Sequence, residues 1–257
     1  MKNLNFYDNN YLLKTKALTK KLKDRSYDLL HLEKGNVVVD LGCGNGYDTR
    51  MLANIVGQTG KVLGVDFDVQ ILQEACKTAE QQNIHNIEYI QADAEAIPLE
   101  NNSCDAVRVE RVFQHLKNPR KVMKEIRRIL KPEGKIVIIE TDWLGLHFHT
   151  PFYKIEQKIV NFLVDHKLNN GRASALLIDY IIGERFQDAQ IEATPFVLSD
   201  YQAAETIIKL EDLILNIQDS NFIDKKELEM WKDTLVSYDE LGFLKGSLNM
   251  LTVTANK

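Results

Sequence analysis

The chain has 257 residues, of which 44% are hydrophobic and 27% charged, and its formal net charge is −5. A chain of this size and apolar content can bury a full core, which excludes a disordered protein and suits one large α/β domain with a small cap. The acidic balance argues against nucleic acid or an anionic membrane surface as a partner.

The N-terminal segment, residues 1–34, is predicted to form a helical lid. Its first residues lack the apolar stretch and cleavage site of a signal peptide, and the chain carries no apolar run near the ~18 residues of a membrane span. Leucines and lysines are interspersed over 10–31 as in an amphipathic helix, whose lysine face we expect in solvent. Phe6, Tyr7 and Tyr11 are candidates for closing over a bound ligand.

The hydrophobic pattern alternates between strand and helix from residue 35 to residue 141. It predicts strands at 37–41, 61–66, 87–91, 104–109 and 135–141, and helices at 47–56, 69–82 and 120–130. Pro132 and Gly134 are expected to form a turn after the last of these helices. Such alternation is typical of a parallel sheet with right-handed crossovers.

After residue 145 the pattern becomes mainly helical. It predicts helices at 152–168, 174–186, 201–217 and 224–240, and strands at 190–198 and 247–255. We therefore expect two late strands beside the parallel core, with helical insertions at about 150–186 and 201–240.

A glycine-rich loop, Asp40-Leu41-Gly42-Cys43-Gly44-Asn45-Gly46, follows the first predicted strand. Glycines at this place allow a tight turn and let a ligand approach the main-chain N–H groups at the start of a helix. A dinucleotide-binding loop would need a further glycine at position 47, where this chain has Tyr47. The loop also lacks the G-K-[ST] ending of a P-loop, so the sequence argues against both NAD(P) and ATP bound in these ways.

Carboxylates stand at the ends of three successive predicted strands. Asp40 can face an ammonium group, Asp66 can accept hydrogen bonds from two ribose hydroxyls, and Asp93 can accept one from an adenine amino group. Taken singly, each could be a helix cap or a turn residue. An adenosine that bears an amino acid and no phosphate, such as S-adenosylmethionine, would use all three.

Five motifs follow one another between residues 35 and 145: VVDLGCGNG, VLGVDFD, IEYIQADAEAIPLENNSCDAV, VFQHLKNP and EIRRILKPEGKIVIIE. In this order they resemble the motifs of class I S-adenosylmethionine-dependent methyltransferases, most of all the branch that includes the ubiquinone- and menaquinone-biosynthesis enzymes. The resemblance implies an α/β, Rossmann-like seven-stranded sheet of order 3-2-1-4-5-7-6 with the last strand antiparallel, in a methyltransferase domain over 35–257. Glu133 departs from the family, which often has Pro-Gly-Gly at 132–134.

The resemblance also implies which residues hold the cofactor. Asp40, Gly42 and Gly44 would line its methionine part, with Cys43 filling space between them. The nucleoside would be held by Asp66 on the ribose, Phe67 on the adenine face, and Asp93 and Ala94 at the adenine edge. Val109, Glu110 and Arg111 would pass near the sulfonium; Arg111 can instead reach the cofactor carboxylate or form a surface ion pair.

Two histidines are candidates for a catalytic base. His115 follows the fourth predicted strand, and could equally line the pocket or cap the next turn. His147 lies in the segment after the fifth strand, where solvated loop histidines are also common. His147 and His149 could share a face, but no third metal ligand is near them, so we expect no metal site.

These patterns together predict a cytoplasmic methyltransferase that uses S-adenosylmethionine to methylate a small-molecule acceptor. The three cysteines lack a C-x-x-C motif, which fits a reducing compartment. Two alternatives stay open: a protein that binds the cofactor without turnover, and an NAD-dependent oxidoreductase. A homodimer is compatible with the sequence, which does not reveal the acceptor or the atom methylated.

Overall fold

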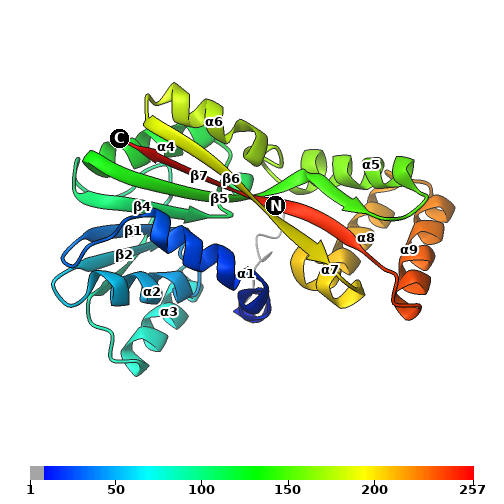
Figure 1. Ribbon diagram of the computed structural model, residues 1–257, viewed down its shortest axis with the longest axis horizontal. Helices are drawn as coiled ribbons and strands as arrows, with labels where there is room; N and C mark the ends of the chain where they lie inside the picture. Colours follow the sequence, from blue (N-terminus) through cyan, green and yellow to red (C-terminus); the bar gives the residue numbers. More distant parts are fainter. Residues whose placement is uncertain (1–8) are drawn as a thin grey trace. The chain divides into compact units, whose positions relative to one another are not determined.

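The computed structural model describes residues 9–257, with their side chains from residue 19 onward (Figure 1). Phe6 and Tyr7 and the side chain of Tyr11 lie outside this part. The helices are α1 (Asn9–Leu29), α2 (Tyr47–Val56), α3 (Val69–Gln81), α4 (Pro119–Ile129), α5 (Tyr153–Phe162), α6 (Ala173–Gly183), α7 (Tyr201–Ile208), α8 (Leu210–Ser220) and α9 (Lys225–Glu240). The strands are β1 (Val37–Leu41), β2 (Lys61–Asp66), β3 (Ile87–Gln91), β4 (Cys104–Glu110), β5 (Leu130–Phe148), β6 (Gln187–Leu198) and β7 (Gly246–Asn256).

The seven strands form one sheet of order β3-β2-β1-β4-β5-β7-β6, as predicted. The pairs among β1 to β5 are parallel. Strand β7 runs antiparallel to β5, because the N–H of His149 donates to the carbonyl of Lys245 and the N–H of Lys257 to that of Gly134. Figure 1 shows the arrow of β7 pointing back along β5. The sheet therefore places the ends of β1, β2, β3 and β4 at one edge.

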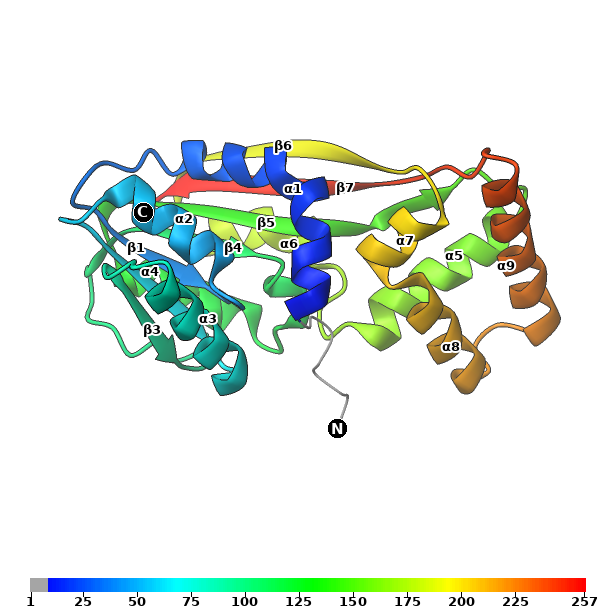
Figure 2. The same cartoon turned by 90° about the horizontal axis from the view of Figure 1, so that it is seen from below.

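Contacts divide the chain into two compact units. The first consists of the chain up to Glu140 with Leu176–Glu192 and Thr252–Lys257, and the second of Thr141–Ala175 and Ala193–Leu251. The core of the first is formed by β-branched residues of β1, β4 and β5, which are fully buried as expected for strands covered on both faces. In the same unit α4 contacts α6 and the residues after it, with Arg120 over the Tyr180 ring and Arg127 over the Phe186 ring. Figure 2 shows α1 in front of β5 and α6 behind it in that view.

Several boundaries differ from prediction. The helix predicted at 201–217 is broken at Lys209, whose φ of +50° is left-handed and separates α7 from α8. Helix α5 passes into a π-helical turn at Leu163–Lys167. The predicted turn at 131–134 is incorporated into β5, which also continues beyond Thr141 to Phe148. A register shift opposite Cys104 and Ala106 accommodates the irregular start of β5.

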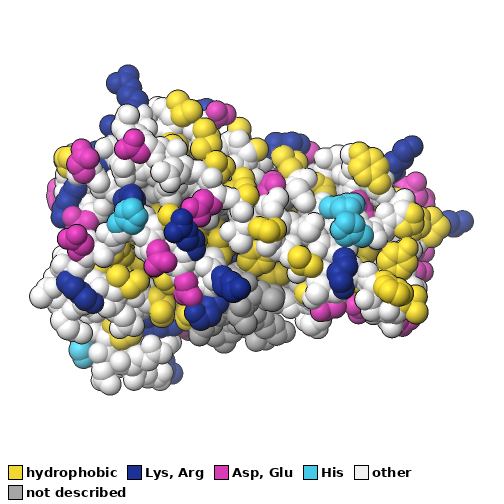
Figure 3. Space-filling model, in the orientation of Figure 1, with side chains coloured by type: hydrophobic (Ala, Val, Ile, Leu, Met, Phe, Trp, Pro, Cys, Tyr) yellow, Lys and Arg dark blue, Asp and Glu magenta, His cyan; other side chains and the backbone are white. Residues whose placement is uncertain are grey.

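On the face shown in Figure 3, acidic and basic side chains are intermixed, and hydrophobic side chains are exposed between them. One expectation for α1 is wrong: Lys20 and Lys21 are exposed, but Lys23 is buried. Its partners are described below. Among residues 9–257, none of the helices combines the length and the apolar character that a membrane span requires. The three cysteines are free thiols.

Glu133 adopts a φ of +65°, the left-handed region that costs a residue with a Cβ about 1–2 kcal/mol. Replacing it by the glycine common in the family, Glu133→Gly, should raise the free energy of unfolding by roughly 0.5–1 kcal/mol in urea titrations. Glu133→Ala is the control, because alanine keeps the Cβ and with it the backbone strain. If both variants gain equally, the gain does not come from the backbone.

Candidate functional site

The glycine loop between β1 and α2 is built from left-handed backbone and close packing. Gly42, Gly44 and Gly46 have φ values of +73°, +51° and +70°. A Cβ on Gly42 would lie 2.2 Å from Cγ2 of Val112, and one on Gly46 would lie 2.3 Å from the Tyr89 hydroxyl oxygen. These two glycines are therefore required by both conformation and space, and the loop brings the start of α2 close to the strand ends.

Asp66 ends β2 and braces the loop. One of its oxygens accepts from the N–H of Gly44 at 2.9 Å, and the other from the N–H of Asp68 at 3.1 Å. Burial raises the pKa of Asp66, while these backbone hydrogen bonds favour the charged form. A carboxylate has about four acceptor positions, so Asp66 can still accept two hydroxyl groups of a ligand.

Two further features border Asp66. Phe67 is 59% exposed, and its ring offers an apolar surface of the kind that stacks on a planar ring. The N–H of Ala92 donates to the carbonyl of Asp66 at 3.0 Å and ties the end of β3 to that of β2. Asp93, just beyond β3, is exposed and accepts from the N–H of Glu95 at 2.8 Å, and Ala94 follows it.

Asp40 has a different environment from Asp66 and Asp93. It is only 2% exposed; it accepts from the Thr49 hydroxyl at 2.6 Å and lies 3.7 Å from Nη1 of Arg108. Burial raises the pKa of Asp40 to about 6, although the charge of Arg108 acts against this rise. Its carboxylate therefore lies beneath the glycine loop with partners inside the protein, and its contact with an ammonium group stays a prediction.

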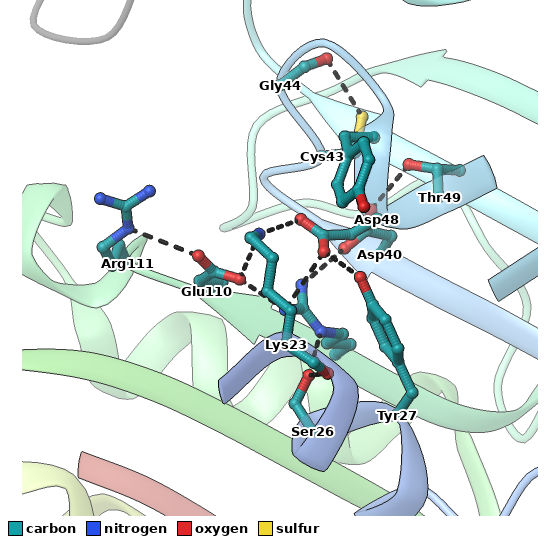
Figure 4. A network of polar contacts seen from close by, with 12 residues as sticks. Lys23, Ser26, Tyr27, Asp40, Cys43, Gly44, Asp48, Thr49, Glu110 and Arg111 are labelled. Carbon is teal, nitrogen blue, oxygen red and sulfur yellow. Dashed lines mark hydrogen bonds and ion pairs between the residues drawn. The ribbon is translucent and has the colours of Figure 1, made fainter. Parts of the chain in front are cut away.

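Asp40 belongs to a buried network around Arg108. Figure 4 shows this network, with Asp40, Asp48 and Glu110 among the labelled residues. The guanidinium is fully buried, lies 2.5 Å from Glu110 and 3.5 Å from Asp48, and donates to the Ser26 hydroxyl at 3.0 Å. It also packs on the ring of Tyr27, 5.3 Å from the centroid. Sequence reasoning missed this network; the available signal was a charged residue in the middle of an apolar strand.

Lys23 of α1 completes the network. Its Nζ lies 2.5 Å from Asp48 and 2.8 Å from Glu110. Burial raises the pKa of Glu110, but Lys23, Arg108 and Arg111 outweigh it and hold that pKa well below its ordinary value. Glu110 is thus a fixed anion at the end of β4, next to Val109.

The residues present fit an amino-acid-bearing adenosine. Oε1 of Glu110 is buried and accepts no hydrogen bond among the described residues; its neighbour is Nε of Arg111 at 3.5 Å. The strand ends also offer the carboxylate of Asp66 and the exposed ring of Phe67. A buried acceptor, a partly satisfied carboxylate and an open aromatic face suit a ligand with an ammonium group, ribose hydroxyls and a planar base.

The two candidate bases lie in different units. His115 is in the first, in a 3₁₀ turn after β4, with its Nε2 3.2 Å from the side-chain nitrogen of Gln114. Burial and the nearby charge of Arg111 lower the pKa of His115 to about 4. The ring is therefore neutral at neutral pH, but so low a pKa makes it a weak proton acceptor there.

His147 lies in the second unit, near the end of β5. Its Nδ1 is 3.0 Å from the buried carboxylate of Glu156, which also accepts from the Thr150 hydroxyl. The rings of His147 and His149 meet edge to face at 5.0 Å. In the part of the chain with described side chains, no three His, Cys, Asp or Glu side chains are grouped as metal ligands. A catalytic role for His147 stays a prediction.

A family model described as "Methyltransferase domain" matches residues 32–180, more than half of the chain, and this range includes the glycine loop, Asp66 and Arg108 but not the α1 residues of the network. The chain belongs to the class I S-adenosylmethionine-dependent methyltransferases. Its resemblance to that family in sequence is thereby confirmed, and the sheet order agrees.

Individual proteins also resemble this chain, and one of them is named a methyltransferase. The demethylmenaquinone methyltransferase of Lactococcus lactis is 38% identical over 120 residues, 47% of this chain and 46% of that enzyme. An uncharacterized 37.1 kDa protein in a Streptomyces fradiae transposon is 28% identical over 88% of this chain and 65% of its own length. The chain thus matches less than two thirds of each. The crystal structure of YcgJ from Bacillus subtilis has a similar fold, with a TM-score of 0.67, 16% identity, and coverage of 93% of this chain and 98% of YcgJ.

The close packing of the glycine loop predicts that Gly42→Ala destabilises the chain. The new Cβ would meet Val112 in a backbone that already disfavours alanine, so the free energy of unfolding should fall by roughly 2–4 kcal/mol in urea titrations. Gly242→Ala is the matched control, because Gly242 has a φ of +74° and a Cβ added there would have no atom within 4 Å. It should lose only the conformational part, about 1–2 kcal/mol. Equal losses of stability in the two variants would show that the contact with Val112 adds nothing to the cost of the substitution at Gly42.

The lowered pKa of His115 predicts that the stability of the folded chain depends on pH. Its pKa in the folded protein, about 4, is below its ordinary 6.5, so protonation favours the unfolded chain. The contribution of neutral His115 to the free energy of unfolding is present above pH 6.5 and is lost as the pH falls toward 4. Its upper limit is about 3 kcal/mol. The variant His115→Gln should flatten the unfolding free energy between these pH values, whereas His85→Gln, at an exposed site, should leave the slope unchanged. An unchanged slope in His115→Gln would contradict a half-buried neutral imidazole.

Proposed function

We propose that the chain transfers the methyl group of S-adenosylmethionine to a small-molecule acceptor by in-line displacement, in the cytoplasm. The observation that carries this proposal is the Gly44–Asp66 hydrogen bond, which joins the glycine loop of β1 to a carboxylate at the end of β2. Membership of the methyltransferase family and the similarity to an enzyme named for demethylmenaquinone support it.

The cofactor residues receive the following roles. Asp66 accepts the ribose hydroxyls, Phe67 packs on the adenine, and Asp93 and Ala94 hold the adenine edge. Gly42, Cys43, Gly44 and Val109 line the methionine part, with Arg111 beside the cofactor carboxylate or the sulfonium. Asp40 supports the methionine subsite from below, because Thr49 and Arg108 occupy its carboxylate.

The bound cofactor supplies a methyl group on a positively charged sulfur, so the chain itself needs to supply position more than chemistry. Holding the acceptor in line and in contact can contribute up to ~7–11 kcal/mol. The left-handed glycines and Asp66, which accepts from the N–H of Gly44, position the nucleoside at the strand ends without needing the acceptor. Residues 1–34 act as the lid in this proposal.

A base is required only for an acceptor that must lose a proton, such as a hydroxyl of low acidity or a protonated amine. His115 is neutral at neutral pH but has the low basicity that its pKa of about 4 implies. His147, whose Nδ1 lies 3.0 Å from Glu156, is the second candidate. An acidic hydroxyl would need neither.

Calorimetry tests the cofactor. The chain should bind S-adenosylmethionine, and Asp66→Ala should weaken binding on the order of 100-fold, because two hydrogen bonds to a charged acceptor are lost. Asp68→Ala is the control: Asp68 caps α3 through Gln70 and Ile71, so its loss should lower the melting temperature with little effect on affinity. Binding of NAD without S-adenosylmethionine would replace the proposal with an oxidoreductase.

Turnover distinguishes an enzyme from a binding protein. With phenols, quinols, amines and carboxylic acids as acceptors, we expect S-adenosylhomocysteine to be released with at least one class. Tight cofactor binding without product from any class would favour a protein that binds S-adenosylmethionine without turnover.

A further inference from the structure

Lys23 of α1 connects the start of α2 to the end of β4, and both border the proposed methionine subsite. Asp48 lies in the first turn of α2, two residues after Gly46, and Glu110 is the last residue of β4. The ammonium group of Lys23 is 2.5 Å from one carboxylate and 2.8 Å from the other. All three side chains are at most 14% exposed, so solvent does little to screen these contacts.

The same face of α1 makes further contacts with these groups. Tyr27, four residues after Lys23, donates its hydroxyl to Asp48, and Ser26 accepts from Arg108. Residues three and four apart lie on one side of a helix, so the three side chains form a single docking face (Figure 4). Helix α1 is thus attached to the site through buried polar groups as well as through its leucines.

We propose that Lys23 is a positioning residue, which through Asp48 and Glu110 holds the glycine loop and the end of β4 at the separation that the amino-acid end of the cofactor requires. This inference rests on the proposed function. Arg108 already lies between the same carboxylates, but its Nη2 contacts Glu110 at 2.5 Å and Asp48 only at 3.5 Å. Arg111 also lies near Glu110, but without Lys23 Arg108 would be the cation left between the two anions, and they should move apart or take up water.

The test compares two ligands in the full chain. S-adenosylhomocysteine carries the amino-acid end, whereas 5′-methylthioadenosine keeps the nucleoside and the sulfur and lacks that end. In Lys23→Met the affinity for S-adenosylhomocysteine should fall about tenfold or more, and that for 5′-methylthioadenosine by less than about threefold. Lys20→Met is the matched control: it removes a lysine ion pair of 2.5 Å on the same helix at a solvent-exposed position, and both affinities should stay unchanged.

Two further variants separate positioning from stability. Lys23→Arg keeps the charge and should recover part of the lost S-adenosylhomocysteine affinity. Tyr27→Phe removes one hydroxyl from Asp48 but keeps the ring on Arg108, and should show the same ligand selectivity with a smaller loss. Tyr27→Phe can also test the positioning role if Lys23→Met does not fold.

The outcomes are distinct. Unchanged affinities in Lys23→Met, or equal losses for both ligands in a folded variant, would overturn the positioning role while leaving the proposed function intact. If Lys23→Met does not fold, unchanged affinities in Tyr27→Phe would overturn it. Failure of the unmodified chain to bind S-adenosylhomocysteine would overturn the proposed function and this inference with it.

Discussion

The arrangement of the site depends on one fully buried guanidinium, that of Arg108. A charge without solvent is costly unless carboxylates and hydrogen bonds surround it, and here Asp40, Asp48 and Glu110 do so. These three residues come from β1, α2 and β4, so the requirement to neutralise one side chain fixes the relative positions of three elements. Ser26 and Tyr27 extend the same constraint to α1.

The network also divides the roles of its carboxylates. Asp40 and Glu110 both lie against Arg108, yet the pKa of Asp40 is raised to about 6 and that of Glu110 is lowered. The difference follows from their distances to cations: Arg108 is 3.7 Å from Asp40, whereas Glu110 has Arg108 at 2.5 Å and Lys23 at 2.8 Å. Glu110 is therefore the more strongly held anion of the pair, and Asp40 is the member that is more easily protonated.

The sequence predicts the regular parts of this structure well, because they follow from local patterns. Runs such as Val37-Val38-Val39 and the glycine loop specify strands and a turn without reference to the rest of the chain. Features that depend on distant residues were not predictable in this way. Lys23 belongs to a lysine-rich helix pattern, and only its partners 25 and 87 residues away make it a buried side chain. The left-handed break at Lys209 likewise has no glycine to announce it.

The three carboxylates at the strand ends illustrate the same limit and what it means for binding. Their positions at the ends of successive strands predict that all three contact the cofactor in the same way. Their exposure to solvent differs, because Asp40 is buried, Asp66 is intermediate and Asp93 is exposed. Of the three, only Asp66 is held by two backbone N–H groups and still open to a ligand, since Asp40 is occupied by Thr49 and Arg108 and Asp93 accepts from one backbone N–H. A rigid acceptor binds more tightly than a mobile one because less conformational freedom is lost. Asp66 should therefore contribute most to affinity, whereas Asp93, exposed and held by a single backbone N–H, should contribute to the choice of base.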